Sequence, residues 1–128
     1  MHQSSYTIVS AYCPFGDDEG NDEKFWNDLQ LLVPHDSSNV IIGGDFNAHM
    51  TLTLARTVGH VIQTDDENLY PTQSDTHAVD LSNFALRNSL FIQNFSTRVS
   101  FFHRITCKSI MAANGGTIID YCLVPPSL

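Results

Sequence analysis

One short stretch, from Val40 to His49, constrains the fold of this chain more than any other (Val-Ile-Ile-Gly-Gly-Asp-Phe-Asn-Ala-His). Its opening run of β-branched residues predicts a buried strand, because such side chains pack well on a pleated surface and resist helix formation. The two glycines that follow let the backbone turn or come close to another group. A buried strand that ends in glycine and then carries polar residues is typical of α/β proteins, which place their sites at strand ends.

Asp45 and Asn47 follow these glycines, with Phe46 between them. If Phe46 points into the core, the alternation of a strand sends Asp45 and Asn47 to the opposite face together. A carboxylate and a carboxamide over one spot suit the activation of water beside a phosphate. The alternative is a β-turn in which both side chains merely satisfy nearby backbone groups.

The 128 residues suffice for one domain with a sizeable core, and no apolar run approaches the roughly 18 residues needed to span a bilayer. The first residues lack the basic and apolar regions of a signal peptide, so we expect an intracellular protein, nuclear or cytoplasmic, without a membrane partner. The wide spacing of Cys13, Cys107 and Cys122 predicts buried apolar thiols rather than a disulfide framework or a zinc site.

The formal net charge of −8 disfavours a nucleic-acid partner at first sight, but the charges are unevenly distributed. Acidic residues crowd the first third of the chain, whereas none lies between Asp80 and Asp120. That interval instead holds the bases of a candidate phosphate-binding edge: Arg87, Arg98, Arg104 and Lys108. The alternative is that these bases are ordinary solvated side chains.

The first elements predict a strand, a helix and a second strand. Residues 6–12 favour a strand that ends at Tyr12, and residues 22–33 have apolar residues at helical spacing. With the strand at Val40, they predict a right-handed crossover unit. The carboxyl ends of a parallel pair meet at one edge of a sheet, so we expect Tyr12 and Asp45 to lie at the same edge.

The rest of the chain gives weaker signals. We expect a long loop with one short helix from Met50 to Thr76, and a helix from Val79 to Ser89 capped by Asp75, Thr76 or His77. Strands are expected at Leu90–Phe95, Val99–Ile105 and Thr117–Val124, with a hairpin-type turn at Asn114–Gly116.

Asp120 is expected in the middle of the last of these strands, which is otherwise apolar. A buried carboxylate is costly unless it is paired or hydrogen-bonded. Its partner is either a backbone N–H or an arginine, or else it orients a catalytic imidazole.

Three motifs occur in the order in which one enzyme superfamily carries them: Ser10–Pro14 (Ser-Ala-Tyr-Cys-Pro), Gly44–Ala48 (Gly-Asp-Phe-Asn-Ala) and Ile119–Val124 (Ile-Asp-Tyr-Cys-Leu-Val). Together they resemble the C-terminal half of the endonuclease/exonuclease/phosphatase superfamily, which has the DNase I-like fold. They look closest to the apurinic-endonuclease-like domains of non-LTR retrotransposons and to craniofacial development protein 2-like sequences. The resemblance covers nearly the whole chain.

This resemblance implies an α/β fold of sandwich type. Residues 1–128 would form a single partial domain of a four-layer sandwich, in which one mixed β-sheet carries helices on one face. It also implies a hydrolase of the nuclease class with Mg²⁺ or Mn²⁺ as cofactor. The implied substrate is the phosphodiester backbone of DNA, with RNA as an alternative.

The resemblance further implies a role for each matching residue. Tyr12 lies near the scissile phosphate, and Asp45 positions or deprotonates the attacking water and weakly binds the metal. Asn47 hydrogen-bonds the phosphate, and Asp120 orients a catalytic histidine. Arg98, Arg104 and Lys108 are weaker candidates for substrate binding.

The chain departs from the family in ways that bear on activity. The family's early asparagine, its metal-binding glutamate and its closing Ser-Asp-His have no counterpart, and the histidines present do not match the catalytic one; His49 follows the central motif without a role there. We therefore expect a fragment with weak metal affinity and little catalysis alone. Its expected partners are the missing half-domain or a downstream reverse transcriptase.

Three alternatives stay open at this stage. The chain could be a phosphoesterase of the same superfamily that acts on phosphoinositides or other small phosphates. It could also be a non-catalytic module for nucleic-acid binding or assembly, recognisable by steep salt dependence. Finally, half a sandwich exposes an apolar sheet face, which predicts association or unstable folding.

Overall fold

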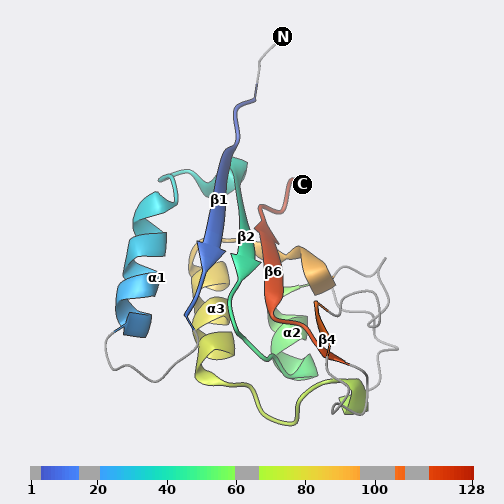
Figure 1. Cartoon of the computed structure of the whole chain (residues 1–128). Helices are drawn as coiled ribbons and strands as arrows, with labels where there is room; N and C mark the ends of the chain where they lie inside the picture. The colour runs from blue at the N-terminus through green and yellow to red at the C-terminus, as the bar shows by residue number, and fades with distance from the viewer. Residues whose placement is uncertain (1–3, 15–20, 60–66, 96–105, 109–115) are drawn as a thin grey trace.

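The computed structural model describes residues 4–14, 21–59, 67–95, 106–108 and 116–128. Its helices and strands follow in the order β1 (Thr7–Tyr12), α1 (Asn21–Leu32), β2 (Val40–Asp45), α2 (Leu52–Val58), α3 (Thr76–Arg87), β3 (Phe91–Ile92), β4 (Cys107–Lys108), β5 (Gly116–Thr117) and β6 (Asp120–Val124) (Figure 1). Short 3-10 turns lie at η1 (Ser37–Asn39), η2 (Glu67–Leu69) and η3 (Gln93–Phe95).

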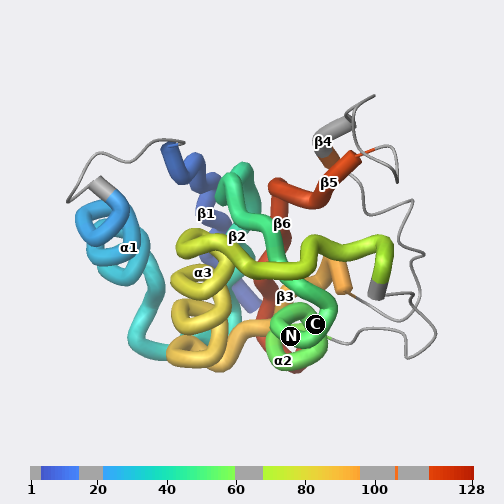
Figure 2. Tube along the Cα trace, turned by 90° about the horizontal axis from the view of Figure 1, so that it is seen from below, coloured from blue at the N-terminus to red at the C-terminus, as the bar shows by residue number. Residues whose placement is uncertain are grey.

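The centre of the fold is one mixed sheet with the strand order β1-β2-β6-β3. β1 and β2 are parallel, whereas β6 runs antiparallel to both β2 and β3. Helices α1, α2 and α3 all lie on one side of this sheet (Figure 2). The structure thus confirms the predicted α/β class, with one mixed sheet and helices on one face; a relation to a four-layer sandwich stays a prediction. None of the described helices combines the length and apolar character that crossing a membrane requires.

The β1–α1–β2 unit forms close to where the sequence predicts it. Asp22 and Glu23 fill the first turn of α1, where carboxylates interact favourably with the helix dipole, and Pro34 follows its end. The parallel register pairs Tyr12 with Asp45. Both residues therefore lie at the same edge of the sheet, as expected.

Phe46, directly after β2, is the centre of the aromatic core and is fully buried. Its ring stacks on Trp26 of α1 with centroids 6.1 Å apart, and packs on Phe25 at 6.3 Å and on Tyr121 of β6 at 6.4 Å. Buried aromatic groups of this size dominate core energetics. A single side chain thus joins the strand end to a helix and to the neighbouring strand.

The strand expected at Leu90–Phe95 is too long, because β3 covers only Phe91–Ile92 and the chain then turns into η3. The cause is a side chain that takes over the pairing with β6. Asn94 donates from Nδ2 to the Asp120 carbonyl at 2.9 Å and accepts from the Cys122 N–H at 2.8 Å. One amide side chain therefore replaces two backbone hydrogen bonds of a longer strand.

The strand expected at Thr117–Val124 is interrupted, with β5 ending at Thr117 and β6 beginning at Asp120. At the break, the N–H groups of Ile119 and Asp120 both donate to Thr106 Oγ1 at 3.0 Å. β5 pairs with β4 in a separate two-stranded sheet, whereas β6 pairs with β2. The Thr106 hydroxyl therefore satisfies the backbone where the chain passes from one sheet to the other. The strand expected at Val99–Ile105 lies outside the described residues, as do Asn114 and Gly115 of the predicted turn.

The second face of the sheet carries no helix in the described part of the chain (Figure 1). On β1 this face presents Ile8, which is 76% exposed, and Tyr12, which is 64% exposed. Ile41 and Cys122 are partly buried neighbours on β2 and β6. Exposed apolar surface of this kind is what an association surface offers. That it is the inner face of one sandwich half stays a prediction.

We predict that Gly44→Ala destabilises the protein by about 3 kcal/mol, because it combines backbone strain with overpacking. Gly44 has a φ of +157°, and an added Cβ would lie 1.8 Å from the Ala11 carbonyl oxygen on β1. The matched control is Gly43→Ala, whose Cβ would meet only the Tyr121 carbonyl at 4.0 Å. Urea unfolding of both variants tests this, and equal losses would contradict it.

Candidate functional site

Polar groups from five elements meet at one edge of the sheet, the lower edge in Figure 1. The carboxyl ends of β1 and β2, the start of β6 and the first turns of α1 and α3 all lie there (Figure 1). This is the edge where open α/β sheets place their ligand sites. Two groups of side chains occupy it, an acidic row across the strands and a cysteine–histidine cluster beside them.

The acidic row consists of Tyr12, Asp45 and Asp120, one from each of three adjacent strands. Tyr12 is the registered partner of Asp45, and Asp45 is the registered partner of Asp120. Registered neighbours point to the same face of a sheet, so the three side chains stand side by side. Tyr12 is exposed, and the two carboxylates are half-buried. The structure therefore brings together three of the four residues that the sequence singles out for catalysis.

The expected position of Asp120 needs correction, because it begins β6 instead of lying in the middle of a buried strand. Its side chain is half-buried, because the interruption of the strand at residues 118–119 leaves Asp120 at the sheet edge. Among the described histidines, none is hydrogen-bonded to Asp120. The predicted role in orienting an imidazole therefore stays a prediction.

Asn47, the fourth predicted residue, takes part in a local turn. Its N–H donates to Asp45 Oδ1 at 2.9 Å, and its backbone is left-handed with φ 47°. Its Nδ2 donates to the Cys13 carbonyl at 2.7 Å. The turn that sequence analysis weighs as the alternative is thus present. Phe46 is buried as expected, but β2 ends at Asp45, so strand alternation does not extend to Asn47. Asn47 ties the ends of β1 and β2 together.

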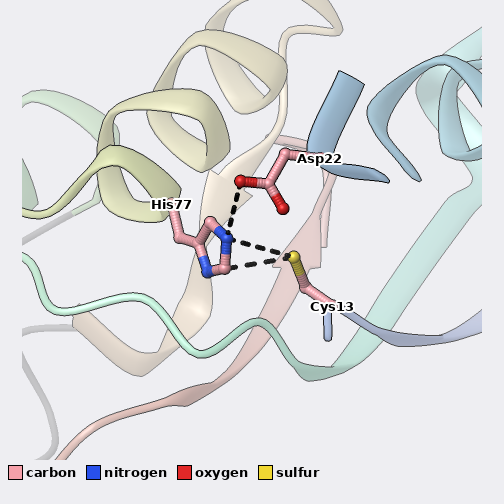
Figure 3. A group of neighbouring side chains, drawn as sticks. All are labelled: Cys13, Asp22 and His77. Atoms are coloured by element: carbon pink, nitrogen blue, oxygen red, sulfur yellow. Dashed lines mark hydrogen bonds and ion pairs between the residues drawn. The ribbon is translucent and has the colours of Figure 1, made fainter. Parts of the chain in front are cut away.

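The second group, the Cys13–Asp22–His77 cluster, was not predicted as a site (Figure 3). Cys13 follows β1, Asp22 lies in the first turn of α1, and His77 lies in the first turn of α3. Cys13 Sγ is 3.9 Å from each ring nitrogen of His77, and His77 Nε2 is 3.2 Å from Asp22 Oδ2. Cys13 is buried in the hydrophobic core, as expected, and its Sγ also faces the imidazole of His77. The sequence signal that could have indicated this cluster is the position of Cys13, directly after Tyr12 at the end of a predicted strand.

The His77 ring is held from two sides. Its Nδ1 lies 3.3 Å from the Asn47 carbonyl oxygen, which can only accept a hydrogen bond. Its Nε2 lies 3.2 Å from Asp22 Oδ2. These two contacts fix the orientation of the imidazole.

His49 and Asp75 form a separate pair. His49 Nδ1 lies 2.7 Å from Asp75 Oδ2, and the His49 N–H also contacts that carboxylate. Asp75 is at the same time the N-cap of α3, since its Oδ1 accepts from the Ala78 N–H at 2.9 Å. This confirms one of the three predicted caps and gives His49 a structural partner.

The edge is strongly negative, and the pKa values reflect this. Burial, and then the charges of Asp22 and Asp80, raise the pKa of the Cys13 thiol to about 11. Burial and the charge of Asp22 also raise the pKa of Asp80. The indole N–H of Trp26 lies near enough to Asp80 to favour its charged form, although it completes no hydrogen bond of normal geometry.

The acidic row does not supply a complete magnesium site. Mg²⁺ prefers an octahedron of hard oxygen ligands, and Asp45 and Asp120 provide two carboxylates. Among the described residues, three metal-binding side chains come close together in the cluster of Cys13, Asp22 and His77. The sulfur and nitrogen donors of this cluster suit softer ions than Mg²⁺. The weak magnesium affinity expected from the sequence stays a prediction.

The predicted basic edge finds no support in the described structure. Arg98 and Arg104 lie outside the described residues, and for Lys108 only the backbone in β4 is described. Arg87 lies in the last turn of α3, at the opposite end of that helix from His77. Arg87 therefore does not reach the acidic row.

Comparison with protein-family profiles, with curated protein sequences and with solved structures gave no match for this chain. The proposed relation to the endonuclease/exonuclease/phosphatase superfamily accordingly rests on the three sequence motifs. What the structure adds is the spatial arrangement of the residues that these motifs contribute.

We predict that Cys13 makes the stability fall at alkaline pH. In the unfolded chain the thiol ionises near its ordinary pKa of 9.0, whereas the folded protein holds the proton to about pH 11. The contribution of Cys13 to the free energy of unfolding is therefore fully present below pH 9 and is lost as the pH rises through 11. Urea unfolding from pH 8 to pH 11, with a metal chelator present, should show a steeper decline for the natural chain than for Cys13→Ser. Parallel declines would contradict this.

Proposed function

We propose that this chain carries one side of a phosphodiester-hydrolysing site that acts on nucleic acid in the nucleus or cytoplasm. The observation that carries the proposal is the registered row of Tyr12, Asp45 and Asp120 at the carboxyl edge of the parallel strands. These residues come from three separate motifs, and Tyr12 and Asp120 lie 108 positions apart in the sequence. Their convergence at one edge is what a shared site requires and what three unrelated turns would not need.

The electrostatics of the row support a charged ligand. Asp45 and Asp120 are direct cross-strand neighbours, and like charges in that position destabilise a sheet. Asp45 and Asp120 would hold a divalent cation, which would remove this repulsion. The ion would supply positive charge to stabilise a phosphate.

The roles of the row follow from its chemistry. Asp45 accepts one hydrogen bond through Oδ1, which leaves Oδ2 to hold or deprotonate a water molecule. Tyr12 is exposed beside it and can donate its hydroxyl to a phosphate oxygen. Asn47 uses one amide hydrogen on Cys13, and the second remains for the substrate.

The same row explains why we expect low turnover. Charge that builds on the phosphate needs several fixed donors, and leaving-group protonation needs a general acid. In the described structure, His77 and His49 are engaged with Asp22 and Asp75, and neither acts on Asp120. The site as described therefore holds and polarises a substrate better than it turns one over.

We predict at most slow plasmid nicking by the 128-residue chain with Mg²⁺ or Mn²⁺. The part of the nicking that belongs to this site should disappear in Asp45→Ala and persist in Asp28→Ala, a control in α1. Robust nicking that vanishes in Asp45→Ala would overturn the expectation of low turnover. Parallel assays on abasic-site DNA and on inositol phosphates separate a nuclease from a small-phosphate phosphoesterase.

The site itself can be tested without turnover. We predict that Mn²⁺ broadens the NMR amide signals of Asp45 and Asp120 selectively, and that a short deoxyoligonucleotide strengthens this effect. The double variant Asp45→Asn/Asp120→Asn should lose the broadening, whereas Asp28→Asn should keep it. Broadening that is indifferent to the double variant, or that the oligonucleotide leaves unchanged, would contradict the proposal.

A further inference from the structure

We propose that Cys13, Asp22 and His77 form a binding site for a transition-metal ion of the Zn²⁺ class. The site is distinct from the acidic row and does not depend on the function proposed for that row. Its three donor atoms are Cys13 Sγ, one Asp22 carboxylate oxygen and His77 Nε2, which lie within 4.8 Å of one another. They come from three separate elements that converge at one point (Figure 3).

The spacing of the donors fits a tetrahedral ion. Zinc bonds of about 2.0–2.3 Å at tetrahedral angles place neighbouring ligand atoms about 3.3–3.6 Å apart. The imidazole–carboxylate distance is 3.2 Å and the imidazole–sulfur distance is 3.9 Å. The third separation, between Cys13 Sγ and the Asp22 carboxylate oxygen, is within 4.8 Å, so side-chain rotations that move these atoms by about an ångström would close the three donors around the ion.

The hydrogen bond at the far side of the imidazole favours a metal at Nε2. His77 Nδ1 lies 3.3 Å from the Asn47 carbonyl oxygen, and Nε2 lies 3.2 Å from Asp22 Oδ2. Both neighbours are hydrogen-bond acceptors, so Nε2 faces an anion that either a proton or a metal ion on that nitrogen would satisfy. Histidine ligands of zinc are oriented in this way, with the second nitrogen donating to a backbone carbonyl or a carboxylate.

The backbone around Cys13 is also held in place. The Cys13 N–H donates to the Asp45 carbonyl at 2.8 Å, and the Cys13 carbonyl accepts from Asn47 Nδ2 at 2.7 Å. Asn47 thus supports two of the three ligands, one through its side chain and one through its own carbonyl. Ligands fixed by such bonds lose little freedom when the ion binds.

The charges favour a divalent cation and the donors select its type. A thiolate, a carboxylate and a neutral imidazole balance the charge of Zn²⁺, which suits a cluster that is largely buried. Sulfur and nitrogen donors disfavour Mg²⁺ and Ca²⁺. Asp22 is 36% exposed whereas His77 is 11% exposed, so the ion would enter from the Asp22 side. Three protein donors leave the fourth position to a solvent molecule.

A different use of the same residues, a nucleophilic cysteine activated by histidine, fits less well. A reactive thiol must be accessible and readily ionised, but Cys13 is fully buried among carboxylates. Moreover, Cys13 Sγ is equally far, 3.9 Å, from both ring nitrogens, whereas a catalytic triad places the nucleophile on one nitrogen and the acid on the other.

The test is a titration of the chelator-treated full chain with Co²⁺, which reports thiolate ligation through a charge-transfer band in the near ultraviolet. We expect one Co²⁺ per chain, displacement by Zn²⁺ but not by Mg²⁺, and a melting temperature that rises with zinc concentration. Asp22→Asn and His77→Gln should weaken binding by at least the roughly 10- to 100-fold that loss of an outer-shell partner costs. Cys13→Ser should abolish the thiolate band.

The controls separate this site from other metal-binding groups. Cys122→Ser removes a half-buried thiol on β6, and His35→Gln removes an exposed imidazole, so neither should change the affinity. Asp22→Asn serves as the decisive variant if Cys13→Ser fails to fold, because Asp22 is partly exposed. Binding without a thiolate band, or an affinity unchanged in Asp22→Asn and His77→Gln, would overturn the proposal. The double variant Asp45→Asn/Asp120→Asn should keep the cobalt band. The cobalt titration therefore tests the cluster even if the function proposed for the acidic row is wrong.

Discussion

The burial of Phe46 is the constraint on which the rest of the structure depends. Its ring lies between α1 and β6, stacked on Trp26 and packed on Tyr121. Burying such a side chain contributes about 2–3 kcal/mol, and shifting the register by one residue would expose it. Because Phe46 is held in the core, Asp45 directly before it is fixed at the strand end beside Tyr12 and Asp120. The position of the candidate site is thus a consequence of core packing.

The same strand end organises both groups of polar side chains. The Asp45 carbonyl accepts from the Cys13 N–H, and the Ile119 carbonyl accepts from the Phe46 N–H at 2.9 Å. The acidic row and the cysteine cluster therefore share one backbone frame, although their donors suit different ions. Oxygen ligands in the row suit a hard cation that a phosphate completes, whereas sulfur and nitrogen in the cluster suit zinc. A metal bound at the cluster would fix the chain that carries the row.

The sheet offers two faces of different character. One is covered by three helices and contains the aromatic core, whereas the other presents Ile8 and Tyr12 in the described part of the chain. The acidic row belongs to the edge of that second face, because Tyr12 contributes to both. A ligand or a polypeptide that covers the face would therefore also border the row. Small residues such as Gly43 leave room on the sheet for close packing.

Local sequence determined the elements whose signals are strong and short-range. β-branched runs predicted β1 and β2, and apolar spacing predicted α1 and α3. The crossover predicted that Tyr12 and Asp45 lie at the same edge of the sheet. Tertiary structure decided what depends on partners distant in sequence. Asn94 shortened β3 and Thr106 interrupted the last strand, since a side chain can replace backbone hydrogen bonds only where the fold delivers it. Convergence of Cys13, Asp22 and His77 is likewise invisible along the chain, because residues 64 positions apart meet only when the helices pack on the sheet.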